Sequence, residues 1–110
     1  MIIQARNQKA VAVLTISGSA FDLRHATQIS RALEKAIEQG YTRLVLDMSQ
    51  VAFFSDLVFE VILRVQDRAE LELVTGKGSV VGWHLKQTRC PYEGVRVFET
   101  TWEAIASFAQ

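Results

Sequence analysis

The side chains of this sequence that could do chemistry are few and lie far apart. His25 and His84 have no second histidine at a metal-binding spacing such as HxxxH or HExxH. Cys90, the single cysteine, precedes Pro91 and has neither a Gly-x-Cys turn nor an evident base to activate it as a nucleophile. We therefore expect neither histidine to bind a metal and the cysteine to be unreactive.

Two other patterns suggest ligand sites, and both have simpler explanations. The segment GKGS at 76–79 resembles a phosphate-binding loop, but it lacks the G-x-x-x-x-G-K-[ST] spacing, so a turn before a helix is the better interpretation. The carboxylates Asp22, Asp47 and Asp56 could form an acidic cluster near helix starts. Carboxylates are common at helix caps and strand ends, so we expect no metal and no cofactor there. Because no set of polar groups converges, an enzyme is not expected.

Composition favours one small globular domain over residues 1–110. The chain is 49% apolar and 22% charged, and its 12 basic and 12 acidic residues cancel. It has no basic run, which argues against nucleic-acid binding. No apolar stretch approaches the roughly 20 residues that span a bilayer, so no membrane insertion is expected. A lone cysteine and an N-terminus without a signal-peptide pattern favour the cytoplasm.

The hydrophobic pattern predicts strands that alternate with helices. Strands are expected at 2–6, 10–17, 44–48, 71–74 and 95–98, with a turn at 7–9 and a break at 18–19. Helices are expected at 25–39, 56–68, 80–88 and after a capping box at 100–103. Asp22 lies just before the first helix, as a cap or a loop carboxylate, and Gly40 would end that helix. Trp102, Ile105 and Phe108 would face inward. This order predicts an α/β fold, a single domain with a four- to five-stranded mixed, mainly parallel sheet and helices packed on it.

The start of the helix at 56–68 is unusually apolar. One stripe already provides a buried face, formed by Val58, Val61, Ile62, Val65 and Ala69. Leu57 and Phe59 flank that stripe. Two interpretations stay open for the segment 57–59: core packing, or an apolar surface that docks another protein. Ser55 and Asp56 are expected to cap this helix.

Three segments, LVLDMSQVAFF, ELELVTGKGSVVGWHLKQT and VRVFETTWEAI, make the chain from Ile2 to Phe108 resemble the STAS domain of bacterial anti-sigma factor antagonists. The resemblance implies a β-α superhelix without catalysis that binds a partner such as an anti-sigma factor or serine kinase, in the regulation of transcription. It also implies a switch. In the family motif Asp-Ser-Ser-Gly-Leu-Gly, a serine at the start of the second helix is phosphorylated, which adds about −1.5 to −2 charges and expels the partner.

Alignment with that motif places Ser55 at its aspartate, Asp56 at its first serine and Leu57 at its phosphoacceptor. Val58 and a glutamate replace the two glycines. Leucine cannot accept phosphate, so no phosphorylation is expected, unless a two-residue gap makes Ser55 the acceptor.

The resemblance therefore predicts a constitutive or scaffold-type protein-binding module. Its expected contact residues are Asp22, Ser55, Asp56, Leu57, Val58 and Phe59. Two alternatives remain: a transporter- or lipid-associated STAS subunit, and a self-assembling structural protein such as a homodimer.

Overall fold

The computed structural model describes residues 2–8, 10–20, 22–55, 58, 60–61, 63–76 and 95–108, with the backbone alone at 19–20 and 52–54. These residues form one five-stranded sheet in the order β1-β2-β3-β4-β5. The strands are β1 Ile2–Gln8, β2 Val11–Ala20, β3 Arg43–Phe54, β4 Glu70–Val74 and β5 Arg96–Phe98. β1 is antiparallel to β2, and the other neighbours are parallel. The predicted mixed, mainly parallel sheet is thus confirmed.

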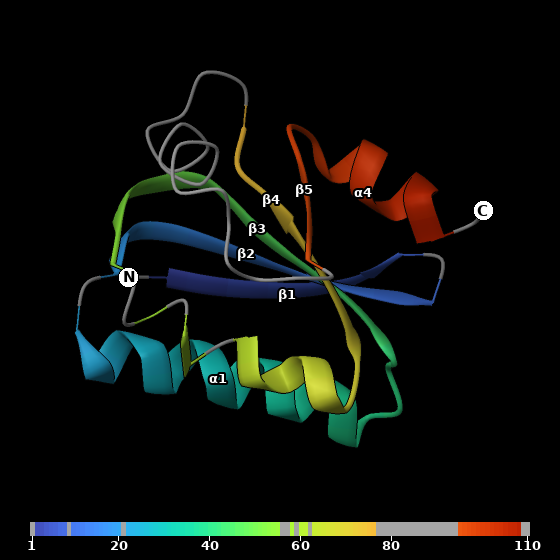
Figure 1. The fold of residues 1–110 in the computed structure, drawn as a ribbon, viewed down its shortest axis with the longest axis horizontal. Helices are drawn as coiled ribbons and strands as arrows, with labels where there is room; N and C mark the ends of the chain where they lie inside the picture. Colours follow the sequence, from blue (N-terminus) through green and yellow to red (C-terminus); the bar gives the residue numbers. More distant parts are fainter. Residues whose placement is uncertain are drawn as a thin grey trace.

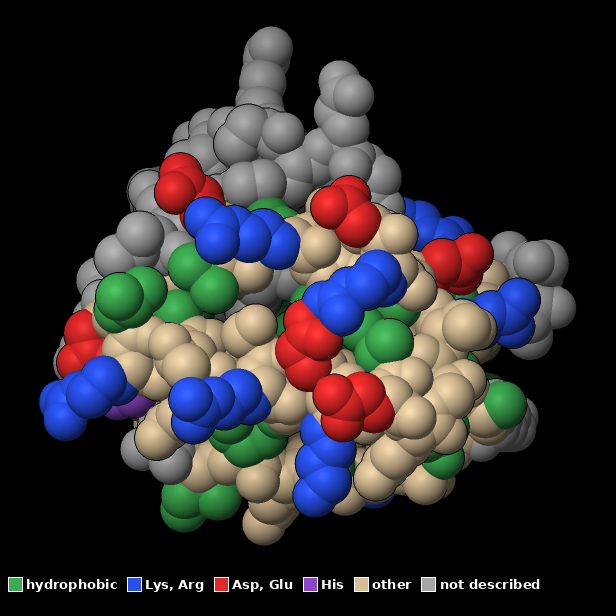
Figure 2. Space-filling model, turned by 90° about the horizontal axis from the view of Figure 1, so that it is seen from below, with side chains coloured by type: hydrophobic (Ala, Val, Ile, Leu, Met, Phe, Trp, Pro, Cys, Tyr) green, Lys and Arg blue, Asp and Glu red, His purple; other side chains and the backbone are tan. Residues whose placement is uncertain are grey.

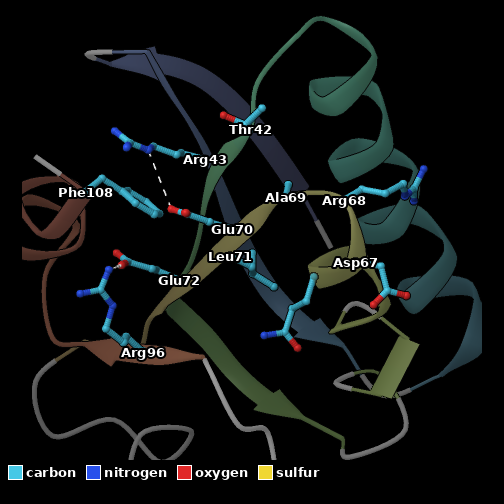
Figure 3. A pocket seen from close by; sticks show the side chains of 11 residues that line it. Thr42, Arg43, Asp67, Arg68, Ala69, Glu70, Leu71, Glu72, Arg96 and Phe108 are labelled. Carbon is cyan, nitrogen blue, oxygen red and sulfur yellow. Dashed lines mark ion pairs between the residues drawn. The ribbon is translucent and has the colours of Figure 1, made fainter.

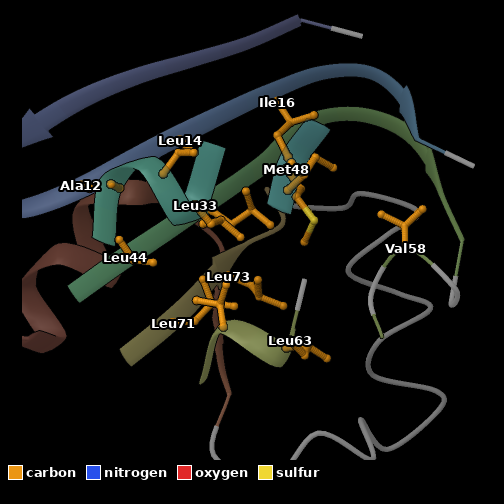
Figure 4. Packing of buried hydrophobic residues seen from close by; sticks show 14 of the residues in the cluster. Ala12, Leu14, Ile16, Leu33, Leu44, Met48, Val58, Leu63, Leu71 and Leu73 are labelled. Carbon is orange, nitrogen blue, oxygen red and sulfur yellow. The ribbon is translucent and has the colours of Figure 1, made fainter. Parts of the chain in front are cut away.

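Helices cover both faces of this sheet (Figure 1). The helix α1 Leu23–Glu38 and the 3-10 helix η1 Leu63–Asp67 lie on one face, and α4 Thr101–Phe108 lies on the other. Alternate strand residues such as Leu14, Leu44 and Leu73 pack with Leu33 of α1 in the larger core cluster (Figure 4). Residues of the opposite parity, including Val13, Val45 and Val74, pack against α4. The central strands are apolar because both of their faces are covered.

The first helix forms close to the predicted range 25–39, but it begins two residues earlier, at Leu23, and ends at Glu38. The buried side chains on α1 are Ala26, Ile29, Leu33 and Ala36. Asp22 is the N-cap, and Gly40 follows the helix with φ 101°, a backbone conformation that glycine adopts without a steric penalty.

Four of the strands are longer than predicted, β5 is one residue shorter, and the pairing of the hairpin extends beyond the predicted turn. Asn7 and Gln8 pair with Ala12 and Val11, so the strand extends into the turn predicted at 7–9, and Ala10 adopts φ 64° before β2 begins. Gly18 was expected to end its strand, but β2 continues to Ala20 with an irregularity in pairing beside Gly18. A glycine with φ 99° accommodates such a bulge without ending the strand.

The segment predicted as a helix at 56–68 is helical at Val58, Glu60 and Val61 but continues as the 3-10 helix η1. Its tighter winding, about 3.0 residues per turn, changes which side chains face the sheet. Leu63 and Val65 are the buried residues of η1. The helix expected at 80–88 lies outside the described residues.

The predicted threonine cap of the last helix is confirmed, with Glu103 reaching back to the Thr100 hydroxyl, but one residue predicted to face inward is exposed. The Glu103 amide donates to Thr100 Oγ1 at 3.2 Å, and that hydroxyl donates to Glu103 Oε1 at 2.9 Å. Trp102 is 64% exposed, so its predicted inward position is wrong. At about 100° per residue, Trp102 lies roughly 110° from the centre of the stripe formed by Ala104, Ile105 and Phe108.

Candidate functional site

Two of the residues expected to bind a partner, Asp22 and Ser55, lie where β2 and β3 end. Ala20 pairs with Phe54, so these two strands end side by side at their carboxyl ends. Asp22 lies two residues after the end of β2, and Ser55 directly follows β3. In sheets with parallel strands, binding sites form preferentially at this end. We call the surface formed by Asp22, Leu23 and Ser55 the docking edge.

Asp22 presents a negative charge at the docking edge. Its Oδ1 accepts a hydrogen bond from the His25 amide at 3.1 Å, and the Arg24 guanidinium lies 3.6 Å from Oδ2. The hydrogen bond from the His25 amide is the main reason that the pKa of the Asp22 carboxyl lies below its usual range; partial burial opposes this shift, and the nearby charges of His25 and Arg24 add to it. The side chain remains 45% exposed, so the carboxylate both caps α1 and faces solvent.

Leu23, the first residue of α1, is a surface residue that sequence analysis missed. It exposes 59% of its surface immediately beside Asp22. The hydrophobic pattern predicts that the helix begins at 25, which leaves Leu23 outside it and without an assigned role. The N-cap at Asp22 was the available clue, because the residue after a cap is the first in the helix. A single exposed leucine is common on proteins, so its importance depends on its place at the docking edge.

Ser55 begins the second helical segment as a cap. The Val58 amide donates to the Ser55 carbonyl at 3.1 Å and approaches Ser55 Oγ at 3.4 Å. The predicted capping role of Ser55 is thereby confirmed. Its side chain is half-buried and is held against the backbone of the segment that it starts.

Val58 is a core residue. Its side chain has no exposed surface and belongs to the larger core cluster, on the same side of the sheet as Met48 (Figure 4). The hypothesis that Val58 contacts a partner is therefore wrong, because the helical stripe turns this residue toward the sheet. The other predicted contact residues of this segment, Asp56, Leu57 and Phe59, lie outside the described residues.

Asp47 does not join Asp22 but ties β3 to α4. Its Oδ1 accepts from the Ser49 amide at 3.0 Å and from Ser49 Oγ at 2.6 Å, and its Oδ2 accepts from Thr101 Oγ1 at 3.2 Å. Asp47 is 8% exposed, so these bonds compensate its burial and support the expected structural role. Within the part of the chain that the structure describes, no three histidine, cysteine, aspartate or glutamate side chains are placed to hold a metal ion.

A hollow of about 670 Å³ lies at the opposite end of the sheet (Figure 3). It is bordered by the first residues of three strands, Arg43, Glu70 and Arg96. Arg43 Nε lies 3.8 Å from Glu70 Oε2, and Arg96 pairs with Glu72. Because these guanidinium groups are already neutralised by carboxylates of the chain, the hollow offers a weaker binding site than its size suggests.

Glu72 is the polar core residue that sequence analysis missed. It is only 2% exposed, pairs with Arg96 and accepts hydrogen bonds from Ser107 Oγ at 2.6 and 2.7 Å. The alternation in ELELV already placed Glu70 and Glu72 on one face of the strand. The pattern could not show which residues bond to Glu72, because Ser107 and Arg96 lie far from it along the chain.

The surface on the α1 side carries no large area of one charge. Figure 2 looks onto this side and shows Lys and Arg side chains interspersed with Asp and Glu across its described residues. Mixed charge of this kind does not attract a polyanion such as nucleic acid. Within the described ranges, no helix has both the length and the apolar character needed to cross a bilayer.

Comparison with known proteins agrees with this geometry. The family model described as "Mlab, STAS domain" matches residues 3–75, which is more than half of the chain. The chain belongs to the STAS family. No curated protein matches this STAS chain significantly in sequence.

Solved structures extend the fold match to nearly the whole STAS chain. An anti-sigma factor antagonist from Mycobacterium paratuberculosis has a TM-score of 0.77 at 16% identity, covering 99% of this chain and 94% of its own. A putative anti-sigma factor antagonist from Thermotoga maritima has a TM-score of 0.76 at 18% identity, covering 98% and 95%. The Bacillus cell fate determinant SpoIIAA in its phosphorylated form has a TM-score of 0.64 at 18% identity, covering 97% and 99%. At these identities the likeness shows the fold.

Proposed function

We propose that this STAS chain is a protein-binding regulatory module of the anti-sigma factor antagonist type, which docks its partner at the docking edge. The observation that carries the proposal is the pairing of a solvent-facing carboxylate, Asp22, with an exposed leucine, Leu23. They follow β2, whose last residue, Ala20, pairs with Phe54, the last residue of β3. An apolar side chain next to a charge suits a protein partner, since it offers both buried area and orientation.

The proposed partner is a protein such as an anti-sigma factor or serine kinase. Solved structures with this fold include proteins named as anti-sigma factor antagonists, which supports that class of partner. The opposite hollow is a poorer alternative, because none of the large apolar side chains that are strongly exposed among the described residues borders it.

The proposed binding is constitutive, without the phosphorylation seen in the solved phosphorylated form of SpoIIAA. The family's acceptor position aligns with Leu57, which has no hydroxyl. Ser55 is the one hydroxyl residue between 55 and 59, and it caps the segment that follows. A hydroxyl that is half-buried against the backbone is poorly placed to reach a kinase active site.

The proposed role is also non-catalytic. The polar groups buried in the described part of the fold are engaged in bonds between elements: Asp47 holds Thr101, and Glu72 holds Ser107 and Arg96. Side chains fixed in this way support the fold and leave no convergent acid, base and nucleophile among them.

The experiment uses purified anti-sigma serine kinases from the source organism, tested one by one against the immobilised chain by biolayer interferometry. The proposal predicts that one of them binds with the same Kd with and without MgATP. Intact-mass measurement of the incubated chain should show no added phosphate.

Leu57→Ser is the positive control, because it restores a hydroxyl at the aligned acceptor position. Phosphate on residues 51–63 of the wild-type chain, accompanied by release of the partner, would contradict constitutive binding. Failure of every kinase to bind would contradict the proposed partner class.

A further inference from the structure

The strand β1 is an edge strand whose own sequence lacks most of the residues that usually protect an edge. It stands at one end of the strand order, and within the described residues no strand pairs with its outer side. It runs for seven residues, IIQARNQ, without proline or lysine, and Arg6 is its one charged residue. Ile2 exposes 63% of its surface. Natural proteins usually cover, shorten or charge such an edge because its free backbone groups can pair with another strand.

The hairpin geometry indicates which backbone groups are free. Gln8 and Val11 pair across a two-residue connection, so they form the hydrogen-bonded pair that closes the turn. Hydrogen-bonded and non-hydrogen-bonded pairs alternate along antiparallel strands. The N–H and C=O groups of Ile3, Ala5 and Asn7 therefore point away from β2.

We propose that a second copy of this chain pairs with β1 in antiparallel orientation about a two-fold axis at Ala5. This register aligns all seven residues of β1, and it pairs the outward-pointing groups of Ile3 with those of Asn7 and those of Ala5 with the same residue of the other copy. The two sheets then become one continuous sheet. The interface is isologous, as closed dimers require.

Charge and side-chain placement favour this occupant. About the Ala5 axis, Arg6 of each copy lies opposite Gln4 of the other, so the strand's one charge does not meet itself. The chain has a formal net charge of +0, so two copies do not repel each other over long range. Ile3 already packs against the core cluster while remaining partly exposed, and pairing would cover more of it. The opposite edge, β5, has only three residues and offers a much shorter ladder.

The test is sedimentation velocity of the full chain over a wide concentration range, with circular dichroism to verify folding. Wild-type protein should form a dimer. Ala5→Pro removes an outward-pointing amide and leaves the bonds to β2 in place, so it should weaken dimerisation at least tenfold while the fold is retained.

A pair of charge variants tests the register separately. Ala5→Asp and Ala5→Lys should each be monomeric, because like charges would face each other at the axis, and an equimolar mixture should dimerise. The proposal is overturned if the wild-type chain stays monomeric, if Ala5→Asp or Ala5→Lys alone still forms a dimer, or if the mixture of the two variants stays monomeric. Partner binding at the docking edge does not depend on these outcomes.

Discussion

Leu23→Ala is the substitution that best separates docking from folding. Leu23 exposes 59% of its surface, and therefore buries the other 41% within the chain. Full burial of a leucine is worth about 1.5–3 kcal/mol, so the substitution should cost about 0.6–1.2 kcal/mol of folding stability. A partner that covers the exposed remainder would lose about 0.9–1.8 kcal/mol, which weakens binding about 4- to 20-fold.

The matched control is Leu33→Ala, on the same helix. Leu33 has no exposed surface, so its truncation should cost about 2–5 kcal/mol of folding stability and leave the affinity of the folded fraction unchanged. Thermal melts followed by calorimetric titration with the purified partner measure both quantities. An affinity within twofold of wild type for Leu23→Ala would refute the assignment of Leu23 to the interface.

Three further substitutions test the supports of the docking edge and the sheet. Folding lowers the pKa of the Asp22 carboxyl from 3.8, so its contribution to stability is present above pH 3.8 and is lost as the pH falls through the folded pKa. Asp22→Asn should therefore flatten the dependence of Tm on pH below 5. An unchanged slope would contradict this. Gly76→Ala should lower the free energy of unfolding by about 1–3 kcal/mol, because φ at this position is +80°. The loss should exceed that of Gly40→Ala, since a Cβ at 76 would lie 3.0 Å from the Ser49 Cβ whereas a Cβ at 40 meets open space. Equal losses in denaturant titrations would count against the contact with Ser49. Thr100→Ala should lower stability by about 1 kcal/mol and Thr100→Ser should not, as chemical denaturation can verify.

The order of elements could be predicted from the sequence because hydrophobic periodicity reflects burial. The stripe that includes Ile29 and Leu33 specifies one face of α1, and the nearly continuous apolar run of β2 indicates a strand covered on both sides. Local capping was predictable for the same kind of reason. Asp22 and Thr100 bond to amides three residues away, so their function depends on neighbours in the sequence.

The features that could not be predicted depend on partners that are distant in sequence. The burial of Glu72 depends on Ser107, 35 residues later, and the polar cluster of Asp47 includes Thr101, 54 residues later. Trp102 is expected to face inward with Ile105 and Phe108, but it is exposed, and its neighbour Thr101 bonds to Asp47. The apolar pattern predicts an α-helix where the 3-10 helix η1 forms, with Leu63 and Val65 in the larger core cluster.

Hydrogen–deuterium exchange of the chain with and without its purified partner tests the docking edge most directly. The account predicts slower exchange at 21–27 and 55–61 in the complex, with unchanged exchange at 67–72, where β4 borders the opposite hollow. Protection confined to 67–72 or to the segment 101–108, with none at the docking edge, would contradict it.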